Sequence, residues 1–151
     1  MIICNAEYED LQEILQLQYL SYQSEANLFK HKDIPPLKQT LDEIKVEYRM
    51  GKILKMLDDS GNIIGSVRAM ENSGTVYIGK LMVHPRYRRK GHGRQLLSEI
   101  EKRFPNKRYE LFTSSRSENN LKLYRSAGYR GFGRKTIDDE LEFIYLEKGL
   151  K

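Results

Sequence analysis

Apolar residues recur about every 3.6 positions in two stretches near the start of the chain, as they do on the buried face of a helix. The first stripe runs from Leu11 to Tyr22. The second follows Pro36, a residue that favours the first turn of a helix, and ends near Gly51. These patterns predict an opening strand over residues 1–4 and a first helix over residues 7–24. An irregular segment over residues 26–35 and a second helix over residues 36–51 follow.

Strand patterns dominate the middle and the end of the chain. Short apolar runs bounded by turn residues predict a hairpin and a third strand, over residues 53–57, 63–70 and 75–83. Next come a helix over residues 91–104 and a strand over residues 109–113. A short helix over residues 117–128 is capped by Ser117 and ended by Gly128, and two strands over residues 129–136 and 141–147 complete the chain. The order β-αα-βββ-α-β-α-ββ predicts a mixed α/β fold in a single domain, residues 1–151, whose sheet is flanked by helices.

The composition is that of a globular protein without covalent or metal crosslinks. Of its 151 residues, 39% are hydrophobic and 31% charged, and no apolar run approaches the roughly 18 residues of a membrane span. The single cysteine, Cys4, excludes an internal disulfide, and the three histidines show no zinc-site spacing. The first residues do not resemble a secretory signal. We therefore expect a cytoplasmic protein that binds no metal and no membrane.

The positive charge of the chain is concentrated in one segment. The formal net charge is +5, and residues 72–98 contain six cations and no Asp or Glu, which leaves a net −1 for all other residues. A basic strip of this kind indicates an anion site, with phosphate as the first candidate. A nucleic-acid backbone and a merely solvated loop are the alternatives. The six cations are Lys80, Arg86, Arg88, Arg89, Lys90 and Arg94.

The centre of the strip, residues 88–94, lies between a predicted strand and a predicted helix and reads Arg-Arg-Lys-Gly-His-Gly-Arg. The first N–H groups of a helix lack partners within it, and the helix dipole makes this end positive. Glycine lets a phosphate approach the backbone, so Gly91 and Gly93 predict a pyrophosphate cradle. Tight packing of strand against helix is the alternative explanation. A Walker loop and a dinucleotide fingerprint do not fit, because Arg94 and Leu96 stand at positions that those patterns reserve for lysine and glycine.

This segment resembles the acetyl-CoA loop of the GNAT superfamily of N-acetyltransferases, whose signature is Arg or Gln, two residues, Gly, one residue, then Gly or Ala. Arg88, Gly91 and Gly93 match its fixed positions. Residues 81–85 resemble the family's strand that ends in Val-x-Pro, and residues 120–129 resemble its second motif, with Asn, Leu-Tyr and Gly-Tyr. The resemblance covers nearly the whole chain. It implies a mixed, mostly antiparallel sheet of about seven strands flanked by about four helices.

The resemblance also implies roles in binding acetyl-CoA. Backbone N–H groups of residues 89–94 would hold the pyrophosphate, and the edge of residues 81–83 would pair with the pantetheine arm as an added strand does. A bulge in that strand would point an N–H at the thioester carbonyl. Asn120 or Asn119 would bond to the pantetheine amides, although many relatives carry this Asn where Ser117 stands here. The bulge would be at Leu81 or Met82. The implied acetyl-CoA contacts are Leu81, Met82, Val83, Arg88, Arg89, Lys90, Gly91, His92, Gly93, Arg94, Asn119 and Asn120.

Acetyl transfer requires that the acceptor ammonium lose a proton and that the departing thiolate be stabilised. Tyr124 matches the family tyrosine near the sulfur, where a phenol can donate to the thiolate; a core aromatic is the alternative. For the base, many relatives use a Glu where Tyr77 stands here. Glu71 is the expected substitute, acting through water, and His84 is a further candidate. Glu25 could attract a cationic acceptor, and desolvation of the amine could make a base unnecessary.

These observations favour an acetyl-CoA-dependent N-acetyltransferase that modifies a primary amine of a small molecule or a protein by direct attack. One alternative is a CoA-binding regulatory module without turnover, because the usual Glu of the central strand is missing. Another alternative, a basic nucleic-acid binder, is disfavoured because the charge collapses onto one glycine loop without interleaved aromatic residues. The sequence names neither the acceptor nor the oligomeric state, and a homodimer stays open.

Overall fold

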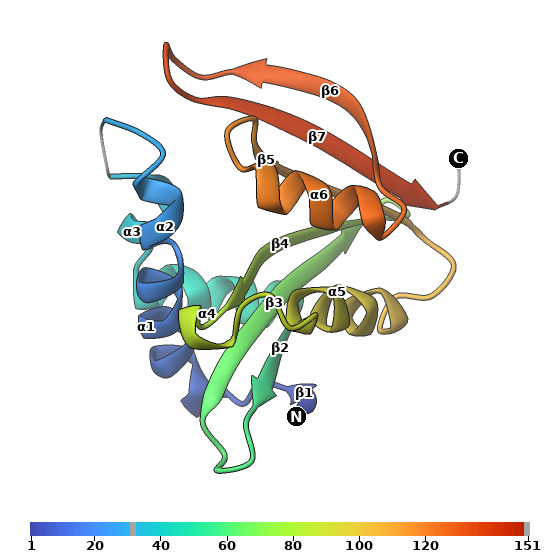
Figure 1. Cartoon of the computed structure of the whole chain (residues 1–151). Coiled ribbons are helices and arrows are strands. Elements are labelled where there is room, and N and C mark those ends of the chain that lie inside the picture. The colour runs from blue at the N-terminus through green and yellow to red at the C-terminus, as the bar shows by residue number, and fades with distance from the viewer. Residues whose placement is uncertain (31–32, 150–151) are drawn as a thin grey trace.

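One seven-stranded sheet organises the protein (Figure 1). The computed structural model describes residues 1–30 and 33–149. The strand order is β1-β2-β3-β4-β5-β7-β6, and every neighbouring pair is antiparallel except β4 with β5, so the expected mixed, mostly antiparallel sheet is confirmed. The strands are β1 (Ile2–Asn5), β2 (Lys52–Leu57), β3 (Ile63–Asn72), β4 (Thr75–Val83), β5 (Arg108–Ser114), β6 (Arg130–Thr136) and β7 (Glu142–Gly149).

The helices of the described residues follow the predicted order. Four longer helices flank the sheet, α1 (Leu11–Ser21), α4 (Leu41–Met50), α5 (His92–Lys102) and α6 (Glu118–Ser126). Shorter helical segments are η1 (Tyr8–Asp10), α2 (Gln23–Ala26), α3 (Pro35–Lys38) and η2 (Pro85–Tyr87). The segment predicted to be irregular, residues 26–35, lies between α2 and α3, and its residues 31–32 fall outside the described part.

The two N-terminal helices that the sequence predicts as continuous are both interrupted. The first begins as η1 and breaks at Tyr22, where α2 starts. The second is divided into α3 and α4 because Gln39 and Thr40 have extended backbone. Thr40 starts α4 through a capping box, in which its Oγ1 accepts the Glu43 N–H at 3.2 Å and the Glu43 carboxylate accepts the Thr40 N–H at 2.8 Å. A helical stripe continues across this break, which is why hydrophobic spacing alone did not reveal it.

Alternating residues of the strands divide the core into two layers on opposite faces of the sheet. On β2, Ile53 belongs to the cluster that contains Ile14 of α1 and Ile44 of α4. Its neighbour Leu54 belongs to the cluster formed with Leu96 of α5 and with α6. Because successive side chains of a strand point to opposite faces, α1 and α4 cover one face, and α5 and α6 cover the other (Figure 1).

The two halves of the sheet are joined by only a short stretch of parallel pairing. β4 pairs with β5 at Thr75, Val76 and Tyr77, and no described pair continues beyond that point. From Ile78 to Val83 the edge of β4 that faces β5 is therefore free of strand partners. In Figure 1 the β5-β7-β6 half turns away from the β1–β4 half accordingly. The candidate site described below is built around this divergence of β4 from β5.

Candidate functional site

A bulge interrupts β4 within its free portion. Arg68 of β3 lies opposite Gly79 and Ser66 lies opposite Met82, so two residues of β4, Lys80 and Leu81, face a single residue of β3. Lys80 has a φ of 52°, a left-handed backbone that is uncommon for a residue with a side chain. A bulge leaves the extra residue out of the ladder. The expectation of a bulge at Leu81 is thus confirmed, and the bulge also includes Lys80.

Unpaired backbone N–H groups gather at the start of α5. The Tyr87 N–H donates to the His84 carbonyl at 2.8 Å, and the Gln95 N–H donates to the Gly91 carbonyl at 3.1 Å. Between them, no N–H of residues 88–94 donates to any residue that the structure describes. Such a run of free donors at a positive helix end is suited to hold an anion with several oxygens.

The two glycines of this loop differ in their surroundings. Gly91 has a φ of 82°, a left-handed conformation that a side chain would strain, and a Cβ there would meet open space. At Gly93 an added Cβ would lie 3.4 Å from Cδ2 of Leu123 on α6. This is an ordinary van der Waals distance, so the packing of α5 against α6 does not by itself require glycine at this position. That Gly93 is small in order to admit a phosphate stays a prediction.

Arg88 points away from the free N–H groups. Its Nε donates to the Val83 carbonyl at 3.2 Å, its Nη1 to Ser24 Oγ at 2.9 Å and its Nη2 to the Ser21 carbonyl at 2.6 Å. The side chain thus ties the end of β4 to the end of α1. Three of its five N–H donors thus contact protein acceptors, and the expectation that this guanidinium contacts a phosphate stays a prediction. A backbone contact of Arg88 stays a prediction.

The other cations of the loop lie at the surface. Arg89 and Lys90 are exposed, and Arg89 has a φ of 63°. Arg94 Nη1 donates to Ser126 Oγ at 3.1 Å, which bridges α5 to the end of α6. His92 is bonded through Nδ1 to a side chain one turn along α5, at 3.1 Å. No salt bridge among the described residues engages Arg89 or Lys90. These two residues are therefore the cations best placed to attract an anion to the loop.

Tyr124 is a buried residue of α6 whose hydroxyl makes no hydrogen bond to a described residue. Burial raises the pKa of Tyr124 far above the usual value for a phenol, and the nearby Tyr22 and Glu25 raise it further. Burial likewise raises the pKa of Tyr22, which the charge of Glu25 also affects. The phenol of Tyr124 consequently stays protonated near neutral pH and can act as a hydrogen-bond donor.

Glu25 of α2 links the N-terminal helices to α6. Its carboxylate accepts from the Ser117 hydroxyl and from Asn120 Nδ2, the latter at 3.1 Å. Ser117 occupies the N-cap position of α6 but makes no side-chain capping bond, contrary to expectation, because its hydroxyl donates to Glu25. Asn120 Nδ2 also donates to Thr113 Oγ1 at 3.3 Å, so its carbonyl oxygen is the part left for a ligand. Asn119 is exposed.

Desolvation raises the pKa of Glu25, and the Ser117 hydrogen bond and the Arg88 charge offset only part of the effect. The sequence suggested Glu25 as an attractor of cations but gave no signal that it contacts Ser117 or lies near Tyr124. Tyr22 was missed as a site residue, because its helical spacing is that of a core position.

Glu71 and His84, the two residues that the sequence suggested as the base, make contacts other than those of Glu25 and Tyr124. Glu71 is paired with Val76 in the β3–β4 ladder, at the closed end of the divergence between β4 and β5, and it forms an ion pair with Lys107 at 2.9 Å. The role of Glu71 as the catalytic base stays a prediction, against which this ion pair and this position argue. His84 Nδ1 accepts the Arg86 N–H at 3.1 Å, which makes His84 the cap of η2.

Comparison with known families decides the class of protein. A family model described as an acetyltransferase (GNAT) domain matches residues 18–150. The chain belongs to the GNAT acetyltransferases. Membership agrees with the resemblance seen in the loop and second motif, and it identifies the chain as a GNAT-type N-acetyltransferase. No curated protein sequence matches it.

Solved structures of GNAT enzymes share the fold. The PaiA N-acetyltransferase from Thermoplasma acidophilum in complex with coenzyme A has a TM-score of 0.83 and 19% identity, over 99% of this chain and 98% of that one. A phosphinothricin acetyltransferase from Sinorhizobium meliloti in complex with AcCoA has a TM-score of 0.77 and 17% identity, over 99% and 88%. The ribosomal-protein-S18-alanine N-acetyltransferase from Escherichia coli has 0.78 and 17%, over 98% and 92%.

The described residues were also compared with the requirements of a membrane-spanning helix and of a metal site. No helix in residues 1–30 and 33–149 is long and apolar enough to cross a membrane. Within the same residues, His, Cys, Asp and Glu form no group of three that could hold a metal ion.

The Arg88 contacts predict a structural role that Lys90, its exposed neighbour, does not share. Arg88→Ala should lower the free energy of unfolding by about 1–3 kcal/mol, because its three hydrogen bonds to β4, α1 and α2 are lost. Lys90→Ala should stay within about 0.5 kcal/mol of the parent protein. Urea denaturation of both variants measures the difference. Equal stability would show that the Arg88 contacts contribute nothing.

Proposed function

We propose that this enzyme transfers the acetyl group of acetyl-CoA to a primary amine by direct attack, without a covalent enzyme intermediate, in the cytoplasm. The observation that carries the proposal is the free edge of β4, with its bulge, beside the unpaired N–H groups of residues 88–94. The free strand edge suits an extended chain with amide groups, and the N–H groups suit a pyrophosphate. CoA contains both of these parts.

The residues present fit such a co-substrate. The pyrophosphate would lie on the N–H groups at the start of α5, with Arg89 and Lys90 beside it. The pantetheine arm would pair along residues 81–83, and the Asn120 carbonyl oxygen would accept one of its amide N–H groups. The bulge at Lys80 and Leu81 would supply an N–H to the thioester oxygen, which becomes negative during attack.

Tyr124 would stabilise the thiolate that leaves. Attack forms the new C–N bond and breaks the C–S bond, and the electron pair of that bond passes to sulfur. Because the pKa of Tyr124 is raised well above that of a thiol, near 8.5, full proton transfer from the phenol to the thiolate is uphill. The role we assign to Tyr124 is therefore hydrogen-bond donation to the thiolate, with solvent supplying the proton that finally forms the thiol.

Glu25 takes the place of Glu71 as the carboxylate closest to the reaction. It lies near Tyr124 and is partly withdrawn from water, so it can attract the acceptor ammonium and receive the proton that the amine loses. Glu25 reaches this position because α2 projects its carboxylate toward Ser117 at the start of α6.

Thiol release from acetyl-CoA, measured across polyamines, aminoglycosides, amino acids and peptides, tests the proposal directly. Acetyl transfer to any of these amines, verified by mass spectrometry of the product, supports it. Tight CoA binding without turnover on any amine would favour the regulatory module instead. Salt-sensitive binding of random DNA that acetyl-CoA does not displace would favour a nucleic-acid binder.

CoA affinity should depend on salt through the exposed cations of the loop. Replacing Arg89 and Lys90 together by alanine should weaken CoA binding by about 0.2–1 kcal/mol per charge and flatten the salt dependence, because exposed charges are strongly screened. Calorimetric titration at low and high salt measures both effects. Lys135→Ala, an exposed cation on β6, is the matched control and should bind CoA like the parent protein. Salt-independent binding would place the loop away from the phosphates.

Tyr124→Phe removes one hydroxyl and keeps the ring. If the hydroxyl donates to the developing thiolate, kcat should fall about 10²-fold or more while KM for acetyl-CoA changes little, because the bond strengthens only as charge develops. The melting temperature should hold, since the hydroxyl has no described hydrogen-bond partner. A kcat within about threefold of the parent enzyme would leave Tyr124 as a core aromatic only.

Glu25 should govern the acidic limb of the pH–rate profile. Only the carboxylate form attracts an ammonium or accepts a proton, so kcat/KM should fall as the pH drops through the raised pKa of Glu25. Glu25→Gln should lower kcat/KM at neutral pH and remove that limb. An unchanged profile in the variant would assign the proton to water or to another group.

A further inference from the structure

A cavity lies beside the bulge on the face of the sheet that α1 and α4 cover. Its volume is about 320 Å³, and it is lined by Pro35, Lys38, Gln39, Glu43 and Lys80. Lys80 belongs to both the cavity wall and the bulge, so this space adjoins the β4 backbone that we assign to the thioester oxygen. The pyrophosphate loop belongs instead to α5, on the opposite face. The cavity is thus placed to receive the acceptor.

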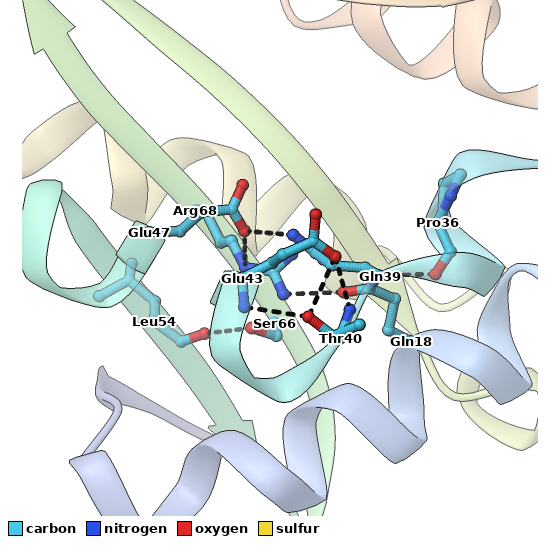
Figure 2. A network of polar contacts seen from close by, with 9 residues as sticks. All are labelled: Gln18, Pro36, Gln39, Thr40, Glu43, Glu47, Leu54, Ser66 and Arg68. Atoms are coloured by element: carbon cyan, nitrogen blue, oxygen red, sulfur yellow. Dashed lines mark hydrogen bonds and ion pairs between the residues drawn. The ribbon is translucent and has the colours of Figure 1, made fainter. Parts of the chain in front are cut away.

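A closed ring of four side chains includes Gln39, one of the residues that line the cavity (Figure 2). Arg68 Nη2 donates to Gln18 Oε1 at 2.7 Å, and Gln18 Nε2 donates to Gln39 Oε1 at 2.9 Å. Gln39 Nε2 donates to Glu47 Oε1 at 2.9 Å, and the same oxygen lies 3.4 Å from Arg68 Nε. The ring joins α1, β3 and α4 to the residue between α3 and α4. Gln39, a lining residue, is therefore held in one orientation.

Lys80 is the positively charged residue of this cavity that forms no ion pair with a carboxylate among the described residues. Arg68 is only 5% exposed, and its Nε and Nη1 have no hydrogen-bond partner. Lys80 forms no ion pair with a described residue, and burial lowers its pKa, an effect that Arg68 increases and that Glu47 and Glu43 oppose. Glu47 is shared with the Arg68 guanidinium, and Glu43 is engaged in the capping box of α4. The formal charges of these four groups therefore balance, but neither carboxylate forms an ion pair with Lys80 among the described residues.

Lys38 does not change this balance. It also lines the cavity, but it is neutralised by Asp33 at 3.0 Å, and both side chains are largely exposed. Lys80 is the lining cation whose charge is left to a ligand.

We infer that the cavity binds a carboxylate of the acceptor, with Lys80 as its counter-ion and the Gln39 ring as its rigid wall. The inference rests on the proposed function and specifies its substrate class, a free amino acid or a close analogue. Because Lys80 is itself in the bulge, the carboxylate must lie only a few bonds from the amine that is acetylated. The ammonium end would then meet the reaction centre while the carboxylate end stays beside Lys80.

Matched acceptors test this inference. Free amino acids are compared with their amides and with the corresponding decarboxylated amines, using acetyl-CoA and the full chain. The parent enzyme should favour the free acids in kcat/KM by about 10- to 100-fold, the range expected for a hydrogen bond to a charged group. Lys80→Met should abolish the preference by raising KM for the acids more than KM for their amides. Lys80→Arg should restore part of the preference.

The control is Lys135→Met, which removes an exposed cation of β6 and should keep the preference intact. Preference for amines without a carboxylate, or an equal effect of Lys80→Met on acids and amides, would overturn the carboxylate site and leave acetyl transfer standing. If no acceptor is acetylated, the proposed function fails, and calorimetry with glycine and CoA decides the site separately. Glycine binding that Lys80→Met removes supports the site, whereas absence of glycine binding to the parent protein overturns it.

Discussion

The divergence of β4 from β5 after Tyr77 is the constraint on which the rest of the site depends. A central strand normally satisfies both edges by hydrogen bonding, and here one edge is left without a partner strand. That edge can remain stable in the folded protein only if water or a ligand satisfies it. The same divergence separates β5 and α6 from α1, so contacts across the opening must come from side chains. Glu25 with Ser117 and Asn120 provides them.

Electrostatics divides the basic segment into two kinds of residue. Arg88 donates hydrogen bonds to carbonyl groups of β4 and α1, and its charge also lies near Glu25. Arg89 and Lys90 keep their charge exposed. Net charge in a sequence window therefore overstated the cations available to a ligand. Side-chain orientation, which charge counts cannot supply, decided which of them can act.

The sequence was sufficient for features that depend on local pattern. The order of helices and strands along the chain, the left-handed glycine at Gly128 and the presence of a bulge in β4 follow from spacing or from motif, and the structure confirms each. The break at Gln39 was missed because hydrophobic spacing continues across it. The contacts of Arg88 and Glu25 join residues more than sixty positions apart in the chain, and no local pattern encodes them. The ion pair of Glu71 with Lys107 also joins distant residues and could not be read from the chain.

The sheet also separates the two halves of the chemistry. Residues expected to hold the co-substrate lie with α5 and α6, whereas the ring of Arg68, Gln18, Gln39 and Glu47 lies on the other face with α1 and α4. The two sides meet at the backbone of β4 and at the contacts of Glu25 with α6. Among the described residues, Lys80 and Gln39 share no hydrogen-bond or ion-pair partner with the loop at the start of α5, so the effects of substitutions at these two places on free energy should add. Acceptor preference can then diversify through residues such as Lys80 and Gln39 while the machinery for the common acyl donor stays the same, which makes this fold easily retargeted.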